Sequence, residues 1–96
     1  MAVDKQDALY LVKARLNRLS GDTSLDDYLG HRVDAAMEYL ENIGIKLTDS
    51  NEDLMLVVDL TVWQYNNRDN PGAMPEWLRL HRRERWLRTE AEADDS

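Results

Sequence analysis

The sequence predicts a small all-α protein, a bundle of about four helices. Apolar residues recur at spacings of three and four along most of the 96 residues, which is the period of an amphipathic helix. Residues that cap or break helices separate these stretches. A chain of this length forms one domain with a modest core, so association with other chains would add stability.

The first predicted helix runs from about Lys5 to Leu19. Asp4 precedes it and can accept hydrogen bonds from its first backbone amides. The apolar residues of this helix lie three and four positions apart, namely Leu9, Val12, Leu16 and Leu19.

The second predicted helix begins after Ser24, with Asp27 three residues on as in a capping box. It ends at Gly44, because glycine readily adopts the left-handed conformation that stops a helix. Its apolar stripe contains Leu25, Leu29, Val33, Ala36, Leu40 and Ile43, joined by Tyr28 and Met37.

The third predicted helix begins near Ser50 or Asn51, runs to about Arg68 and carries two apolar faces. One face holds Leu54, Val57, Val58, Thr61 and Tyr65, and the opposite face holds Leu56, Leu60 and Trp63. A surface helix needs only one apolar face. The helix is therefore either sandwiched inside its own domain or gives Leu56, Leu60 and Trp63 to a neighbouring subunit.

The fourth predicted helix begins at Pro75, after a turn at residues 70–72, and is rich in arginine over residues 76–89. We expect Trp77, Leu80 and Leu87 to face the core and Trp86 to lie on the opposite side. Tryptophan bracketed by arginine is typical of interface anchors. The predicted partner interface consists of Arg79, Arg82, Arg83, Arg85, Trp86 and Arg88. A second interpretation leaves Trp86 partly buried against a neighbouring helix.

An acidic segment follows the arginines, with carboxylates at Glu90, Glu92, Asp94 and Asp95. We expect one helical domain over residues 1–89 and a flexible acidic tail over residues 90–96. The net charge of −7 disfavours non-specific binding of DNA by the whole molecule.

The sequence offers little for catalysis, so we predict no enzyme, no metal and no cofactor. Cysteine is absent, which removes thiolate ligands and nucleophiles. His31 and His81 lie on different predicted helices, and neither has a second ligand at metal-binding spacing. No signal sequence or membrane-spanning run is visible, so we expect a cytoplasmic protein without a membrane partner.

Residues near the third and fourth helices carry a resemblance to a known family. Tyr65, Asn67 and Arg68 form a Tyr-x-Asn-Arg motif, and a Met-Pro-x-x-Leu-Arg motif follows at residues 74–79. Over Val57–Leu87 the chain resembles the head–tail connector proteins (adaptors, or head-completion proteins) of tailed bacteriophages and prophages. The acidic tail departs from that resemblance.

The resemblance implies a structural protein that assembles as a ring beneath the portal and extends the DNA channel. Its partners would be the portal protein, neighbouring copies, and a tail or stopper component, with DNA only as passing cargo. Its location would be the virion neck, and the host bacterial cytoplasm during assembly. By position, residues 79–96 would help to grip the portal.

Two other functions stay open from the sequence. The first is a small helical DNA-binding or regulatory protein that uses the arginine-rich helix 76–89. The second is an antitoxin-like or other prokaryotic adaptor. The position of the arginines in the fold therefore bears on the choice between DNA binding and docking on a protein.

Overall fold

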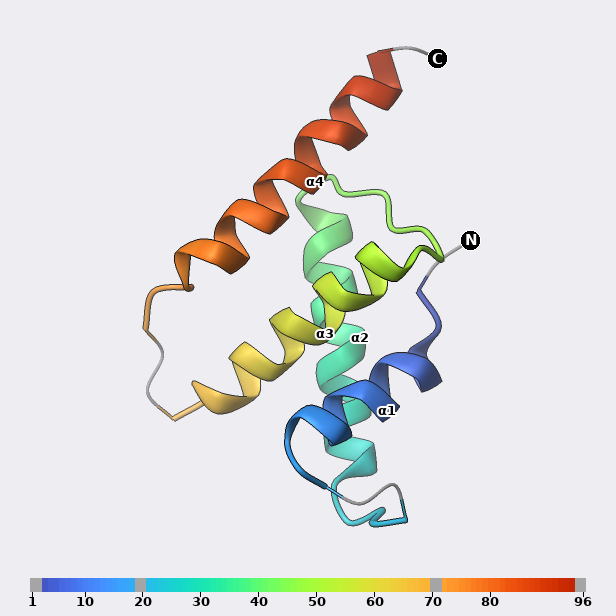
Figure 1. The fold of residues 1–96 in the computed structure, drawn as a ribbon, viewed down its shortest axis with the longest axis vertical. Coiled ribbons are helices and arrows are strands. Elements are labelled where there is room, and N and C mark those ends of the chain that lie inside the picture. Colours follow the sequence, from blue (N-terminus) through green and yellow to red (C-terminus); the bar gives the residue numbers. More distant parts are fainter. Residues whose placement is uncertain (1–2, 19–20, 70–71, 95–96) are drawn as a thin grey trace.

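Four helices and their connections make up the computed structural model, which describes residues 3–18, 21–69 and 72–94. The helices are α1 (Lys5–Arg15), α2 (Asp26–Asn42), α3 (Asn51–Asn66) and α4 (Glu76–Asp94), and the described residues contain no strand. Figure 1 shows α1, α2 and α3 gathered together, with α4 running past them. The predicted all-α bundle is confirmed.

Local capping sets several helix boundaries. The Asp4 carboxylate accepts hydrogen bonds from the backbone amides of Gln6 and Asp7 at the start of α1. Ser50 accepts one from the Asp53 amide at the start of α3. Ser24 caps nothing, because its amide and hydroxyl both donate to Asp22 instead, and α2 begins without a side-chain cap.

Two helices end earlier than the apolar pattern indicates. The first, α1, ends at Arg15, and Asn17 then takes a left-handed φ of 61° that cannot continue a helix. Leu19 lies outside the described residues. The third, α3, ends at Asn66 rather than Arg68.

The two apolar faces of α3 are both used inside the domain, because α1, α2 and α4 all pack on this helix. Leu56 and Leu60 are 0% and 1% exposed. The predicted contact of Leu56 and Leu60 with a neighbouring subunit is therefore wrong. Trp63 is partly buried and packs on the same core.

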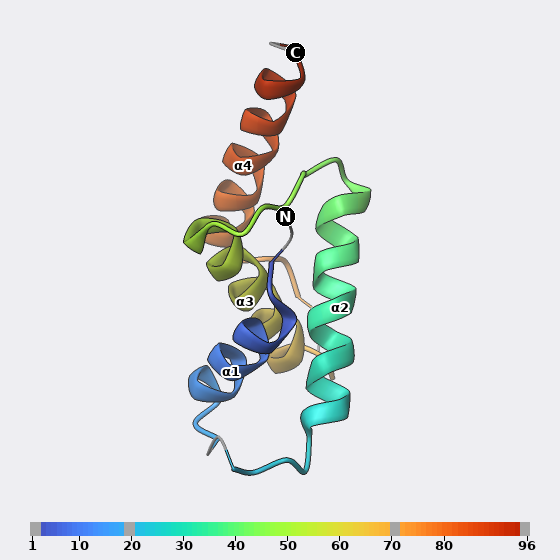
Figure 2. The same cartoon turned by 90° about the vertical axis from the view of Figure 1, so that its right-hand side faces the viewer.

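Helix α4 is the least enclosed of the four. Among the helices, its backbone lies close to that of α3 alone, whereas the backbones of α1, α2 and α3 approach one another in every pairing. A side-chain hydrogen bond from Arg82 to Tyr39 also joins α4 to α2. In two perpendicular views its C-terminal end projects beyond the other helices (Figures 1 and 2). It extends to Asp94, so the helix boundary predicted at residue 89 is wrong, since the alanines and glutamates of residues 90–93 favour helix. The flexibility of residues 90–96 stays a prediction.

The turn after α2 depends on Gly44, which has a φ of +104°. Its amide and that of Ile45 donate to the carbonyls of Glu41 and Leu40, which closes the helix end. A Cβ at this position would lie 3.0 Å from Nε1 of Trp86.

We expect Gly44→Ala to destabilise the domain by about 1–2 kcal/mol, the typical cost of a left-handed conformation for a residue with a Cβ. Urea unfolding measures this. Gly21→Ala is the matched control, because a Cβ at Gly21 would meet nothing within 4 Å. Equal unfolding midpoints for the two variants would contradict the expectation.

Candidate functional site

The buried face of α4 differs from the one that the sequence predicts. Leu78 and Arg85 are buried, whereas Trp77, Leu80 and Leu87 are 54%, 47% and 49% exposed. The expectation that these three apolar residues face the core is therefore wrong. Leu78 and Arg85 lie two helical turns apart and face the same side, so an arginine shares the inner face that periodicity assigns to apolar residues.

Arg85 holds this inner face through a buried ion pair with Asp53 of α3. Its Nε lies 2.7 Å from Oδ1 of Asp53, and its Nη2 lies 3.2 Å from Oδ2. Two parallel hydrogen bonds of this kind are the strongest geometry for an arginine–carboxylate pair. Arg85 also donates to Thr89 and to the Lys46 carbonyl. Arg85 is thus a structural residue, and its assignment to a partner interface is wrong.

The Asp53 carboxylate is held in its charged form. Burial is the largest influence and would raise its pKa. Hydrogen bonds from Arg85 and Thr48, with the charge of Arg85, outweigh burial and lower the pKa of Asp53 below its ordinary 3.8. The Thr48 amide and hydroxyl lie 2.7 and 2.8 Å from Oδ2. Stability from this carboxylate is therefore present above about pH 4.

Two further arginines of α4 have partners within the chain. Arg82 donates to the Tyr39 hydroxyl of α2, and its guanidinium lies 5.9 Å from the centre of that ring. Arg88 pairs with Glu52 of α3, and the hydrogen bond from Arg88 is the main cause that lowers the pKa of Glu52.

Arg79 and Arg83 differ from the other arginines of the predicted interface, which all have partners within the chain. Both are exposed, and within the described part of the chain neither forms an ion pair or side-chain hydrogen bond. Their charges are therefore available to a partner. Among the arginines of the predicted interface, Arg79 and Arg83 are therefore the two most suited to contact a partner protein.

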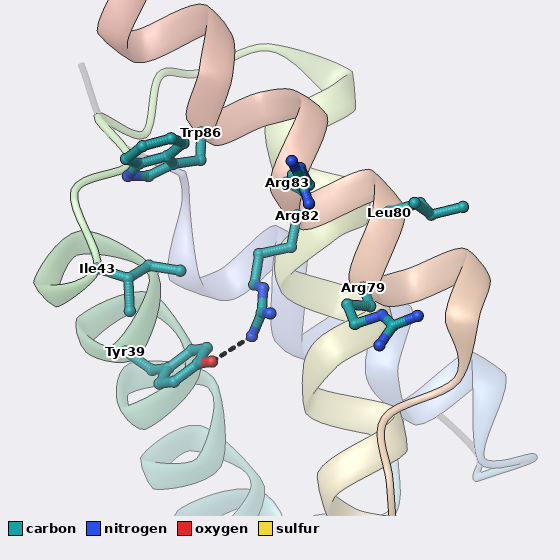
Figure 3. Close-up of a pocket in the computed structure, with 7 residues that line it drawn as sticks. All are labelled: Tyr39, Ile43, Arg79, Leu80, Arg82, Arg83 and Trp86. Atoms are coloured by element: carbon teal, nitrogen blue, oxygen red, sulfur yellow. Dashed lines mark hydrogen bonds between the residues drawn. The ribbon is translucent and has the colours of Figure 1, made fainter.

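An open groove of about 610 Å³ lies between α2 and α4, and we name it the arginine groove. Its lining comprises Tyr39 of α2 and Ile43, the residue that follows α2, with Arg79, Leu80, Arg82, Arg83 and Trp86 of α4. Figure 3 shows Trp86 directed toward Ile43 rather than away from the domain. The interpretation with Trp86 partly buried against a neighbouring helix is the one that the structure supports.

A second surface of α4 faces away from the core, and sequence reasoning missed it. We name it the outer stripe, and it consists of Trp77, Leu80 and Leu87. These residues lie three and seven positions apart, so they follow one side of the helix. Large exposed apolar side chains aligned in this way are typical of protein-binding surfaces. The sequence places these three residues on one side of the helix, but it does not show that this side faces solvent.

The residues of the Tyr-x-Asn-Arg motif close the end of α3. The Asn67 side chain donates to the Trp63 carbonyl, at 2.8 Å. The Arg68 guanidinium donates to the Tyr65 carbonyl and lies 4.1 Å from the centre of the Tyr65 ring. Part of the motif that carries the family resemblance thus has a local structural role.

The histidines and carboxylates of the described residues form no group of three that could hold a metal ion. His81 lies 3.8 Å from Glu52, at the edge of the contact between α3 and α4.

Within the described part of the chain, no helix combines the length and the apolar character that a membrane-spanning segment needs. No protein-family model, curated protein or solved structure matches the chain.

Proposed function

We propose that this protein is a structural assembly protein of the phage head–tail connector type, which docks on other proteins through α4. One observation carries the proposal, namely the outer stripe of large apolar side chains that lie exposed along α4. Exposed tryptophan and leucine on the outer side of a helix do not stabilise a monomer, but they are the residue types that fill pockets on a partner. The portal protein and a tail or stopper component are the partners that the family resemblance suggests.

The basic residues give less support to the DNA-binding alternative. Arg82, Arg85 and Arg88 already bind Tyr39, Asp53 and Glu52. Only Arg79 and Arg83 of the predicted interface have no partner within the described residues, and two phosphate contacts give weak binding against a net charge of −7. We therefore place protein docking ahead of nucleic-acid binding.

Co-purification with the portal protein of the same phage or prophage genome tests the proposal. We expect the wild-type chain to be retained in a ring-sized complex, as measured by native mass spectrometry. The double variant Trp77→Ser and Leu80→Ser should lose at least about tenfold in affinity, because it removes two exposed anchors. Its thermal stability should stay near that of the wild type.

Tyr10→Ser is the matched control, because Tyr10 is a large aromatic residue on α1 that is 62% exposed. This variant should bind the portal as the wild type does. Absence of portal binding by the wild type at micromolar concentration would contradict the proposal. Retardation of duplex DNA at physiological salt would favour the DNA-binding alternative instead.

A further inference from the structure

The arginines that lack a carboxylate partner gather at two hollows of this acidic protein. The chain has 19 acidic residues against 12 lysines and arginines, so most arginines have a carboxylate within reach. Within the described residues, carboxylates pair with Arg15, Arg18, Arg85 and Arg88. The remaining arginines all line either the arginine groove or a second, smaller hollow. The smaller hollow lies away from α4 and has no part in the proposed function.

This smaller hollow lies between α2 and the C-terminal end of α3, and we name it the motif hollow. Its described lining comprises Arg32 of α2 with Trp63, Gln64, Asn67 and Arg68. Asn67 and Arg68 belong to the Tyr-x-Asn-Arg motif. The hollow has a volume of about 230 Å³, many times the ~10–15 Å³ that one water molecule needs by the same kind of measure. It therefore has room for a small anion, and its described lining contains no carboxylate.

Two tyrosines hold the arginines of the motif hollow in place. Arg32 donates from Nε to the Tyr28 hydroxyl, at 3.0 Å, and its guanidinium lies 5.3 Å from the centre of that ring. Arg68 lies over the ring of Tyr65 in the same way. The two tyrosine rings contact each other edge to face, with their centres 6.0 Å apart. A ligand would therefore meet two guanidinium groups that are already ordered, which lowers the cost of binding.

Both guanidinium groups keep most of their hydrogen-bond donors. A guanidinium carries five N–H donors. Within the described residues, Arg32 uses only Nε, and Arg68 uses only Nη1, which donates to the Tyr65 carbonyl. Arg32 thus retains Nη1 and Nη2, and Arg68 retains Nε and Nη2. Two neighbouring N–H groups of this kind match two oxygens of a phosphate or a carboxylate.

Gln64 favours a phosphate over a carboxylate. Its Oε1 is buried and has no hydrogen-bond partner within the described residues. A buried acceptor without a donor is costly, so a ligand that brings a hydroxyl to it gains affinity. Hydrogen phosphate carries one hydroxyl besides its charged oxygens, whereas an ionised carboxylate group only accepts hydrogen bonds.

We infer that the motif hollow is a binding site for hydrogen phosphate. Its charged oxygens accept hydrogen bonds from Arg32 and Arg68, and its hydroxyl donates to Gln64. The ligand joins α2 to the end of α3, because the two arginines come from these two places. The dianion also meets two positive charges that no carboxylate of the described residues neutralises.

Nuclear magnetic resonance of the full-length protein tests this site. Inorganic phosphate is added in mildly alkaline buffer, with sodium chloride adjusted to hold the ionic strength constant. We expect saturable shifts of the Trp63 indole signal and of the Gln64 and Asn67 side-chain amides, with a dissociation constant of about 1 mM or lower. Sulfate, a dianion without a hydroxyl, should bind about fivefold more weakly or worse.

Arg32→Gln and Arg68→Gln should each weaken phosphate binding at least about tenfold, because each removes a charged pair of donors. Arg83→Gln is the matched control, since it removes the same charge from an exposed position on α4, and it should bind phosphate as the wild type does. The backbone amide signals show whether each variant is folded. If Arg68→Gln disturbs the end of α3, Arg68→Lys replaces it, because lysine keeps the charge but not the paired donors.

Three results would overturn the inference. The first is a wild type without saturable shifts, and the second is phosphate binding that both glutamine variants retain. The third is binding of duplex DNA that both variants abolish, without any response to inorganic phosphate, which would assign the hollow to a nucleic-acid backbone. Equal affinity for sulfate and phosphate would overturn the role of Gln64. Portal binding by Arg32→Gln should match the wild type, so failure here leaves the proposed function standing.

Discussion

Replacing Arg85 with methionine is expected to destabilise the domain by about 3–5 kcal/mol, as is typical when one partner of a buried ion pair is removed. The substitution leaves the buried Asp53 carboxylate without its charged partner. A domain of this size has about 5–15 kcal/mol of stability in total, so much of it would be lost. Urea unfolding at neutral pH measures the change.

Arg83→Met is the matched control, because Arg83 is an exposed arginine of the same helix. Its effect should stay within about 0.5 kcal/mol, as for most surface substitutions. Equal losses for the two variants would show that Arg85 contributes no more than a surface charge.

The pH dependence gives a second readout of the same pair. The pKa of Asp53 is lower in the folded protein than its ordinary 3.8. The wild type therefore keeps this contribution above about pH 4 and loses it as the pH falls through the folded-state pKa. In Arg85→Met the guanidinium no longer offsets burial, so we expect the pKa of Asp53 to be higher than in the wild type. The stability gap between wild type and variant should therefore narrow on acidification, and a gap independent of pH would contradict this account.

Trp86→Ala should have the second largest effect and should lower the stability of the isolated protein by about 2–3 kcal/mol. This is less than the 3–5 kcal/mol typical of a fully buried tryptophan, because Trp86 is only partly buried. In a domain of this size the melting temperature should fall by on the order of 10 °C. This agrees with the second interpretation of the sequence, in which Trp86 is partly buried against a neighbouring helix, and not with the one that makes it an interface anchor.

Trp77→Ala is the matched control, with the same side chain on the same helix and 54% exposure. Its melting temperature should stay near that of the wild type, and under the proposed function its portal binding should fall. Differential scanning calorimetry of both variants provides the comparison. A larger loss of stability for Trp77→Ala than for Trp86→Ala would mean that α4 packs on α3 with the opposite face.

The sequence predicted the helices well where the signal is local. Asp4 and Ser50 cap helices through amides two or three residues away, and Gly44 ends α2 through its own backbone conformation. The burial of both α3 faces was one of two interpretations that the pattern left open. Choosing between them depends on which helices pack on α3, and periodicity carries no such information.

The orientation of α4 could not be predicted in this way. Apolar residues occupy more than one side of this helix, and counting them favours the side of Trp77, Leu80 and Leu87. The inner face instead depends on Arg85, whose partner Asp53 lies 32 positions earlier. The arginine groove could not be predicted for the same reason, since its lining joins Tyr39 and Ile43 to residues about forty positions later in the chain.

The ion pair between Arg85 and Asp53 also determines which side of α4 meets solvent. We expect a turn of the helix about its axis, which would move the outer stripe toward the core, to leave the Asp53 carboxylate without its charged partner. Our hypothesis is that the pair favours this rotation of α4 over others, so that it contributes to the uniqueness of the fold as well as to its stability. If α4 docks on other proteins as proposed, the buried charge at Asp53 keeps the tryptophan and leucines of the outer stripe on the solvent side and available to them.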